Sequence, residues 1–297
     1  MDKNLIFFDV ECANNFSGTG KIYSFGYVIT DSQFNILQKD DILINPNTRW
    51  DWHVVKNILV YEKDDFLDKP TFASVHHKVR HLLSENIPLG FAVLNDIKHI
   101  NDECVRYLLE PIIADCYDVQ YVHKKLTGAR EPSGLIKIAR ELEIDTSHFS
   151  EHKSCDDAHI TMLILKYICE LEPVKELDVF AVLDMFKCSK INTKQTLSQM
   201  NFKRQLKEIR SGYKLKRGTK KVYITKDVEN GLEQDALLTL ISRIYKRGFD
   251  YTKKRQDAHF IVVLEKAPKV QSEPPPKTKK AMRKEITLAE LDTMLQK

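Results

Sequence analysis

The stretch Leu5-Ile6-Phe7-Phe8-Asp9-Val10-Glu11 places four apolar residues directly before two acids that are separated by one residue. The apolar run predicts a buried strand, and alternate residues of a strand point to the same face. Asp9 and Glu11 would therefore leave one strand end together, where unpartnered charges are costly. Carboxylate oxygens suit hard divalent cations such as Mg2+ or Mn2+. A lone Asp-x-Glu can also simply end a strand, so the rest of the chain decides between the two interpretations.

The composition predicts a globular protein with one large or two modest domains. The chain has 297 residues, of which 42% are hydrophobic and 30% are charged. It has no run of about 20 apolar residues that would span a bilayer, and its first residues lack the features of a signal peptide. The 6 cysteines are scattered without paired spacing, which is typical of free thiols in a reducing compartment. We therefore expect a cytoplasmic protein without membrane association.

The charges divide the chain into an acidic part and a basic part. Residues 1–185 contain 19 Lys and Arg against 30 Asp and Glu, whereas residues 186–297 contain 27 against 12. Such a division favours two modules, the second suited to a polyanion, although ordinary solvated surface charge is the alternative. The residues expected to contact nucleic acid lie on a predicted hairpin and in a later basic segment: Lys214, Lys216, Arg217, Lys220, Lys221, Lys253, Lys254 and Arg255.

Residues 1–175 alternate between strand-like and helix-like stretches. Strands are expected at 5–9, 22–30, 34–44, 88–93 and 112–117. Helices are expected at 72–85, 96–109, 119–126, 132–142 and 154–170. Antiparallel strands followed by strands that are separated by helices indicate a mixed α/β sheet.

The remaining residues change in character. Residues 186–266 are expected to form a small basic α+β domain with helices at 194–209 and 235–246, a hairpin at 213–225 and a strand at 259–265. Residues 267–284 are rich in Pro and Lys and predict a flexible linker.

The last segment, 285–297, predicts a short amphipathic helix. Thr287 and Glu290 have the spacing of a capping box, and the apolar stripe consists of Leu288, Leu291 and Leu295. A helix this short is marginal alone in water, so we expect it to dock on a protein partner or on the chain itself.

Two further acids and a histidine occur where predicted elements begin. Asp96 follows the apolar segment 90–95 at the start of one predicted helix, and Asp157 lies in the first turn of another, five residues after His152. Ligand sites of open α/β sheets gather at strand ends. Four acids and a histidine brought together there are what two-metal phosphoryl transfer requires, and the histidine could take the proton of the attacking water. Each residue also has a simpler interpretation, since Asp157 completes a capping box with Ser154 and acids are favoured at helix starts.

The segments FDVE at 8–11, GFAVLND at 90–96, and His152 with Asp157 resemble the three motifs of the DEDDh exonuclease family. Members of this family include the epsilon proofreading subunit of bacterial DNA polymerase III, ribonuclease T and oligoribonuclease. The resemblance covers about residues 1–172 and implies a ribonuclease H-like fold with a mixed five-stranded sheet flanked by helices. It implies two Mg2+ or Mn2+ ions and a general base, His152, with the ions held by Asp9, Glu11, Asp96 and Asp157. The implied reaction removes nucleoside 5′-monophosphates from a single-stranded 3′ end, with DNA expected as the substrate.

The chain departs from the family pattern at several positions. Cys12 stands where Thr or Ser is frequent, Phe91-Ala92 replaces a usual His-Asn, and Leu59-Val60-Tyr61 is nearest to a usual His-Gly-Ile. These departures concern substrate preference more than the metal site. Asp156 is a second acid beside Asp157, but neighbouring helical residues diverge by about 100° and the family spacing selects Asp157. An exoribonuclease, or a non-catalytic nucleic-acid-binding or scaffold module on the same fold, are the alternatives.

Overall fold

The computed structural model describes residues 3–172, 174–186, 190–265 and 283–296 and divides the chain into two compact units. Unit 1 is Met1–Ser198 and unit 2 is Gln199–Lys297. The expected boundaries at 175 and 186 differ from this division. Helix α7 (Val179–Met185) buries Val179, Val182 and Leu183 in the core of unit 1, which is why the first unit extends past the expected end.

Neither a membrane helix nor a disulfide bond occurs in the described parts of the chain. No helix there combines the length and the apolar character needed to cross a bilayer. The cysteines within the described residues are free, namely Cys12, Cys104, Cys116, Cys155 and Cys169. Cys188, the remaining cysteine of the sequence, lies outside the described residues.

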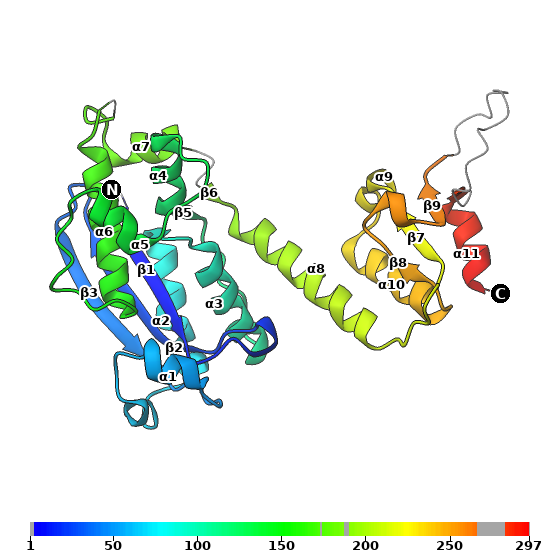
Figure 1. Ribbon diagram of the computed structural model, residues 1–297, viewed down its shortest axis with the longest axis horizontal. Helices are drawn as coiled ribbons and strands as arrows, with labels where there is room; N and C mark the ends of the chain where they lie inside the picture. Colours follow the sequence, from blue (N-terminus) through cyan, green and yellow to red (C-terminus); the bar gives the residue numbers. More distant parts are fainter. Residues whose placement is uncertain (1–2, 173, 187–189, 266–282, 297) are drawn as a thin grey trace. The chain divides into compact units, whose positions relative to one another are not determined.

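Unit 1 is built on a six-stranded mixed sheet with the order β3-β2-β1-β4-β5-β6 (Figure 1). β1 pairs antiparallel with β2, β2 with β3, and β5 with β6, while β1–β4 and β4–β5 are parallel. The expected mixed sheet is therefore confirmed, but it has one strand more than the five expected. The additional strand, β6, has only two residues, too few for an alternation pattern to reveal it. The strands are β1 (Leu5–Cys12), β2 (Ile22–Thr30), β3 (Ile36–Leu43), β4 (Ile87–Gly90), β5 (Cys116–Asp118) and β6 (Lys190–Ile191).

Helices cover both faces of this sheet. Leu5 and Phe7 of β1 pack with Ile160 and Ile164 of α6 on one face. On the other face, Phe8 lies against the side of α2 and α3. Alternation along β1 thus decides which of its side chains meets which helix layer. Besides α7, the helices that begin in unit 1 are α1 (Trp52–Asn57), α2 (Phe72–Glu85), α3 (Leu94–Arg106), α4 (Val119–Thr127), α5 (Leu135–Glu141), α6 (Ser154–Cys169) and α8 (Thr193–Ser211).

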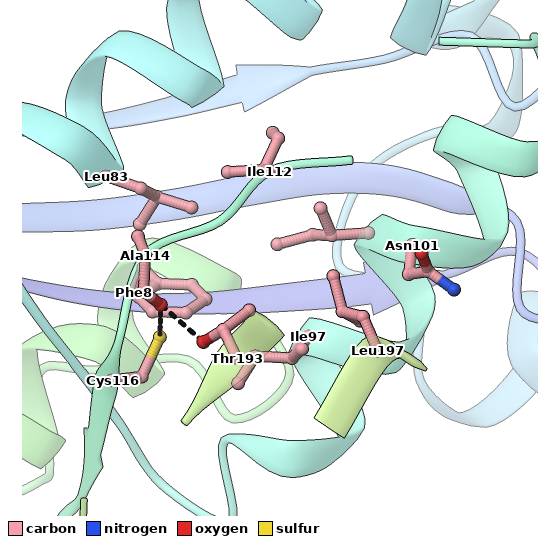
Figure 2. Close-up of a pocket in the computed structure, with 10 residues that line it drawn as sticks. Phe8, Leu83, Ile97, Asn101, Ile112, Ala114, Cys116, Thr193 and Leu197 are labelled. Atoms are coloured by element: carbon pink, nitrogen blue, oxygen red, sulfur yellow. Dashed lines mark hydrogen bonds between the residues drawn. The ribbon is translucent and has the colours of Figure 1, made fainter. Parts of the chain in front are cut away.

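A small, mostly apolar cavity lies behind Phe8, and the start of α8 closes it (Figure 2). Leu197 of α8 contributes to its wall. The Cys116 thiol, 3.1 Å away, and the Thr193 hydroxyl both donate to the carbonyl of Ala114, as the dashed lines in Figure 2 show. These contacts fasten the first turns of α8 to the sheet edge of unit 1.

Unit 2 contains a four-stranded sheet with the order β10-β9-β7-β8, in which every neighbouring pair is parallel. The expected hairpin at 213–225 is wrong, because β7 pairs with β8 and β9, which come later in the chain. Parallel strands need a crossover connection, which α10 supplies between β7 and β8. The unit is therefore a parallel α/β structure rather than α+β. Its elements are β7 (Lys221–Ile224), α9 (Lys226–Asn230), α10 (Gln234–Lys246), β8 (Asp250–Tyr251), β9 (Phe260–Val263), β10 (Lys284–Thr287) and α11 (Leu288–Gln296).

The C-terminal segment belongs to the core of unit 2. The expected linker at 267–284 lies almost wholly outside the described residues, and the strand β10 occupies the first part of the segment expected to be helical. Thr287 and Glu290 form the predicted cap, since the Thr287 amide donates to Glu290 Oε2 at 2.8 Å and the Glu290 amide to Thr287 Oγ1 at 3.3 Å. Leu291 and Leu295 are 0% and 4% exposed within unit 2. The apolar stripe is thus buried by its own chain, which is the second of the two dockings expected for this helix, and a protein partner at this segment stays a prediction.

Candidate active site

The end of β1 carries Asp9 and Glu11 toward the face of the sheet that α6 covers. Both residues continue the alternation that places Leu5 and Phe7 against α6. Asp9 pairs with Gly26 and Glu11 with Ser24 on β2. Directly opposite residues of an antiparallel pair share a face. The side chains of β2 beside the two acids therefore decide how closely α6 can approach them.

Gly26 allows the first turn of α6 to lie directly on the sheet. A Cβ at this position would be 1.9 Å from the Cys155 amide nitrogen and 2.1 Å from the Ser154 carbonyl carbon. No side chain fits into that space, since real Cβ atoms keep more than 3.0 Å from such neighbours. The glycine opposite Asp9 is thus the local reason why Asp157, two residues after Cys155, lies beside the end of β1.

Glu11, His152 and Asp157 form one cluster, and their ligand atoms all lie within 4.8 Å of one another. His152 Nδ1 is 3.4 Å from Glu11 Oε1. The Glu11 side chain is 17% exposed and that of His152 is 48% exposed, so the cluster opens to solvent on the histidine side. Oxygen atoms and an imidazole at such separations can hold a divalent cation.

Asp96 reaches the same strand end from the other side of the sheet. It lies in the first turn of α3, is 5% exposed, and its Oδ1 accepts a hydrogen bond from the Val10 amide at 3.3 Å. The turn before α3 contains Ala92 at φ 51°, and its amide donates to Asp118 Oδ1 at 3.2 Å. Asp96 thus lies at the backbone between Asp9 and Glu11.

Burial and mutual repulsion disfavour the charged forms of these acids. Burial, and then the charges of Asp96, Glu11 and Asp157, raise the pKa of Asp9 well above its usual value. Burial also raises the pKa of Asp96. Burial and the charge of Glu11 raise the pKa of Asp157 to about 7. Buried acids whose charges repel one another are a donor set that a divalent cation stabilises, so these residues fit metal ions.

His152 occupies an unusual backbone conformation beside Glu11. Its φ is 65°, in the left-handed region, which costs a non-glycine residue about 1 kcal/mol or more. The hydrogen bond with Glu11 raises the pKa of His152, while burial acts in the opposite direction. The imidazole is therefore held at the edge of the acid cluster by both the loop and Glu11.

Asp156 points away from the cluster. Its carboxylate pairs with Lys39 at 2.7 Å and with Lys153 at 3.7 Å. Burial raises the pKa of Asp156, but the Lys39 hydrogen bond and the Ser150 amide outweigh it, so the pKa is lowered overall. The structure thus separates the two neighbouring acids, with Asp157 in the cluster and Asp156 in a salt bridge.

An acid that the sequence did not single out, Asp41 of β3, holds the start of α6. Its Oδ1 accepts hydrogen bonds from Ser154 at 2.8 Å and from Ser24, and its Oδ2 accepts one from Tyr61. Asp41 pairs with Gly26 across β2 and β3, on the face that α6 covers. No local pattern could have identified it, since its partners come from three distant segments.

The predicted nucleic-acid-binding residues all lie in unit 2. Seven are exposed and Lys221 is half-buried. Lys221, Lys253 and Lys254 line a groove that also contains three cations of α8 that were not predicted: Lys203, Lys207 and Arg210. Their spacing of four and three residues was the available signal, because it puts them on one face of a helix.

Comparison with known proteins identifies the family. The family model described as exonuclease (RNase_T) matches residues 6–165, more than half of the 297-residue chain. Among curated proteins nothing matches.

Solved structures share the fold. A 3′-exonuclease that recognises the 3′ end of histone mRNA stem-loop has a TM-score of 0.51 and 15% identity, covering 57% of this chain and 82% of its own. A structure of exonuclease I has a TM-score of 0.53 and 16% identity, covering 62% of this chain. Exonuclease I of E. coli in complex with a dA16 oligonucleotide has a TM-score of 0.51 and 16% identity, also over 62% of this chain. The matched region spans 44% and 43% of these two exonuclease I chains. The expectation drawn from the motifs is confirmed at the level of the family, while a special likeness to the epsilon subunit stays a prediction. The chain therefore belongs to the RNase_T exonuclease family.

Proposed function

We propose that this protein is a metal-dependent 3′→5′ exonuclease that releases nucleoside 5′-monophosphates from single-stranded DNA. The observation that carries the proposal is the cluster of Glu11, His152 and Asp157, with ligand atoms within 4.8 Å, at the strand end that also bears Asp9 and Asp96. A structural role alone would not explain why acids that repel one another gather there.

Asp9, Glu11, Asp96 and Asp157 would hold two Mg2+ or Mn2+ ions. The acids offer only oxygen ligands, and their raised pKa values reflect burial and repulsion that cations relieve. When bound, the ions supply activation of the attacking water and stabilisation of the leaving oxygen.

His152 would act as the general base. Its ring is 48% exposed, so a water molecule of the substrate complex can reach it, and Glu11 at 3.4 Å fixes its orientation. The neutral imidazole accepts the proton of that water, and Glu11 then stabilises the imidazolium. The backbone of His152 has a φ of 65°, and its ring lies beside Glu11.

The proposed substrate is a single strand, and two fold relatives bear on its chemistry. Exonuclease I was solved with a dA16 oligonucleotide, which supports DNA. The 3′-exonuclease that recognises histone mRNA supports RNA as the second candidate. These two relatives support different substrates, so the substrate has to be tested directly.

The test uses matched single-stranded DNA and RNA oligonucleotides with a 5′ label, incubated with Mg2+ or Mn2+. We expect a ladder shortened from the 3′ end and nucleoside 5′-monophosphates as products, with faster degradation of DNA. Asp9→Ala should abolish product release, and the same variant should keep the circular dichroism spectrum of the wild type. Absence of mononucleotides from both strands with either ion would refute catalysis and leave the scaffold alternative. Faster RNA degradation would overturn the DNA assignment alone.

A further inference from the structure

Unit 2 contains a basic groove that the catalytic site does not use. One wall comes from α8 and the other from β8 and the residues after it, and the cavity has a volume of about 440 Å³, the size of a ligand site. It is lined by two carboxylates, Asp250 and Asp257, and by a larger number of cations: Lys203, Lys207, Arg210, Lys221, Lys253 and Lys254.

Most of these cations have no ion-pair partner among the described residues. Within the described residues, the ion pairs of unit 2 engage Arg210, Arg243 and Arg255, and none engages a lysine of the groove. Lys253 lies over the Phe202 ring at 5.7 Å, which orients its ammonium group without neutralising it. Positive charge concentrated in a concavity attracts anions from solution.

An acid in the wall of the groove lies beside one of its cations. Asp250 is 8% exposed and faces the groove, and its Oδ1 has no hydrogen-bond partner among the described residues. Its Oδ2 is 3.8 Å from Arg210 Nη2. The Oδ1 atom is itself closed to solvent, so the carboxylate lies within the wall of the groove and acts on a ligand through Arg210.

We propose that this groove binds a segment of single-stranded nucleic acid. Phosphates would lie along Lys203, Lys207 and Arg210 on one side and Lys253 on the other. Asp250 would keep Arg210 in position. A cavity of about 440 Å³ has the volume of a small-ligand site and so suits single nucleotide units of a strand. The assignment of the ligand as nucleic acid rests on the proposed function, whereas the existence of an anion-binding groove does not depend on it.

Only some of the residues predicted from the sequence to contact nucleic acid line this groove. Of the residues predicted from the sequence, Lys221, Lys253 and Lys254 line this groove. Lys216 and Arg217 line a neighbouring depression that shares Arg210, Lys221 and Asp250 with it. The cations of α8 contribute the wall that the sequence did not predict.

The test measures the binding of fluorescein-labelled 20-nucleotide single-stranded DNA and RNA to the full chain by anisotropy, in EDTA. EDTA removes the divalent cations that the proposed hydrolysis needs, so the binding result does not depend on whether the protein is active. The groove variant is Lys203→Gln/Lys207→Gln, and the matched control is Lys226→Gln/Lys246→Gln, which removes the same charge from exposed residues outside the groove.

We expect the groove variant to weaken binding about tenfold at 0.1 M salt and to lower the slope of log K against log salt by about 1.4, from about 0.7 per lost phosphate contact. The control should lose less than about twofold. Equal losses in both variants, or displacement of the probe by AMP or inorganic phosphate at millimolar concentration, would overturn the groove as a strand site.

Asp250→Asn gives an independent test. A purely coulombic account expects tighter binding when a negative charge is removed from a basic groove. The proposal expects several-fold weaker binding, because Arg210 loses the ion-pair partner that positions it. Unchanged or tighter binding by a variant with the melting temperature of the wild type would remove Asp250 from the site.

Discussion

The acid cluster should make the metal-free protein less stable as pH rises, and Asp157→Asn should remove part of that loss. The folded pKa of Asp157 is about 7 against an ordinary 3.8, so burial and the charge of Glu11 together oppose its ionisation by about 3 pH units. At 1.36 kcal/mol per unit, the ionised carboxylate costs the folded state about 4 kcal/mol above pH 7.

The sign follows from the direction of the shift. Below about pH 4 both folded and unfolded chains carry a protonated Asp157, and no cost exists. Between pH 4 and 7 only the unfolded chain releases the proton, so the wild type loses stability as pH rises. At pH 5 the cost is about 1.6 kcal/mol, so from pH 5 to 8 it grows by about 2–3 kcal/mol. Asparagine does not titrate, and its burial adds only a penalty that is independent of pH. Between pH 5 and pH 8 the variant should therefore lose about 2–3 kcal/mol less stability than the wild type.

Urea unfolding in EDTA at pH 5 and pH 8 measures this difference. Tryptophan fluorescence reports unit 1 alone, because the 2 tryptophans of the chain are Trp50 and Trp52. Trp50 packs 5.2 Å from the Tyr23 ring, so its emission changes on unfolding. Added Mn2+ at 100 times its Kd should stabilise the wild type by about 2.7 kcal/mol and the variant much less.

Asp156→Asn is the matched control, since its pKa is lowered by Lys39 despite burial. That variant should be less stable than the wild type at pH 8, and the deficit should shrink as pH falls toward the ordinary aspartate value. The reasoning is refuted if Asp157→Asn has the same dependence on pH as the wild type in EDTA.

Three further predictions concern the elements around the cluster. Gly26→Ala should lower the free energy of unfolding in urea by about 1–3 kcal/mol and the rate of nucleotide release about 100-fold. The reason is that its methyl group would lie 1.9 Å from the Cys155 nitrogen and displace α6. Wild-type rates would refute this. His152→Ala and His152→Gly should both lose about 10²–10⁴ in kcat, but the glycine variant should be about 1 kcal/mol more stable, since φ is 65°; equal stabilities would contradict the backbone argument. Asp41→Ala should lower kcat about tenfold with little change in KM, since Ser154 loses its acceptor, and Asp41→Asn should restore much of the rate; a change in KM alone would exclude this positioning role.

The sequence could predict the parts of the site that depend on local pattern. The apolar run 5–8 fixes β1, and alternation then places Asp9 and Glu11 on one face. The acids at the starts of α3 and α6 follow from helix boundaries. The role of Gly26 could not be predicted, because it depends on the register of β2 against β1 and on which helix covers that face.

The incorrect predictions concern residues whose partners are distant in the sequence. The turn around Gly218 suggested a hairpin, since its φ of 84° is typical of a tight turn. The partners of β7, however, are β8 and β9, which follow α10 in the chain, and no local signal records such parallel pairing. Asp41 was missed for the same physical reason, since Ser24, Tyr61 and Ser154 meet it only in the folded chain.

The contribution of 283–296 to unit 2 has a consequence for protein engineering. β10 adds to β9, and α11 buries Leu291 and Leu295 in the same core, while Arg243 pairs with Asp292 at 2.8 Å. If the chain is cleaved between Glu265 and Arg283, the C-terminal peptide retains every one of these contacts and should stay bound without a covalent link. The two pieces produced separately would form a complementation pair, in which one strand and one helix restore the fold of the other.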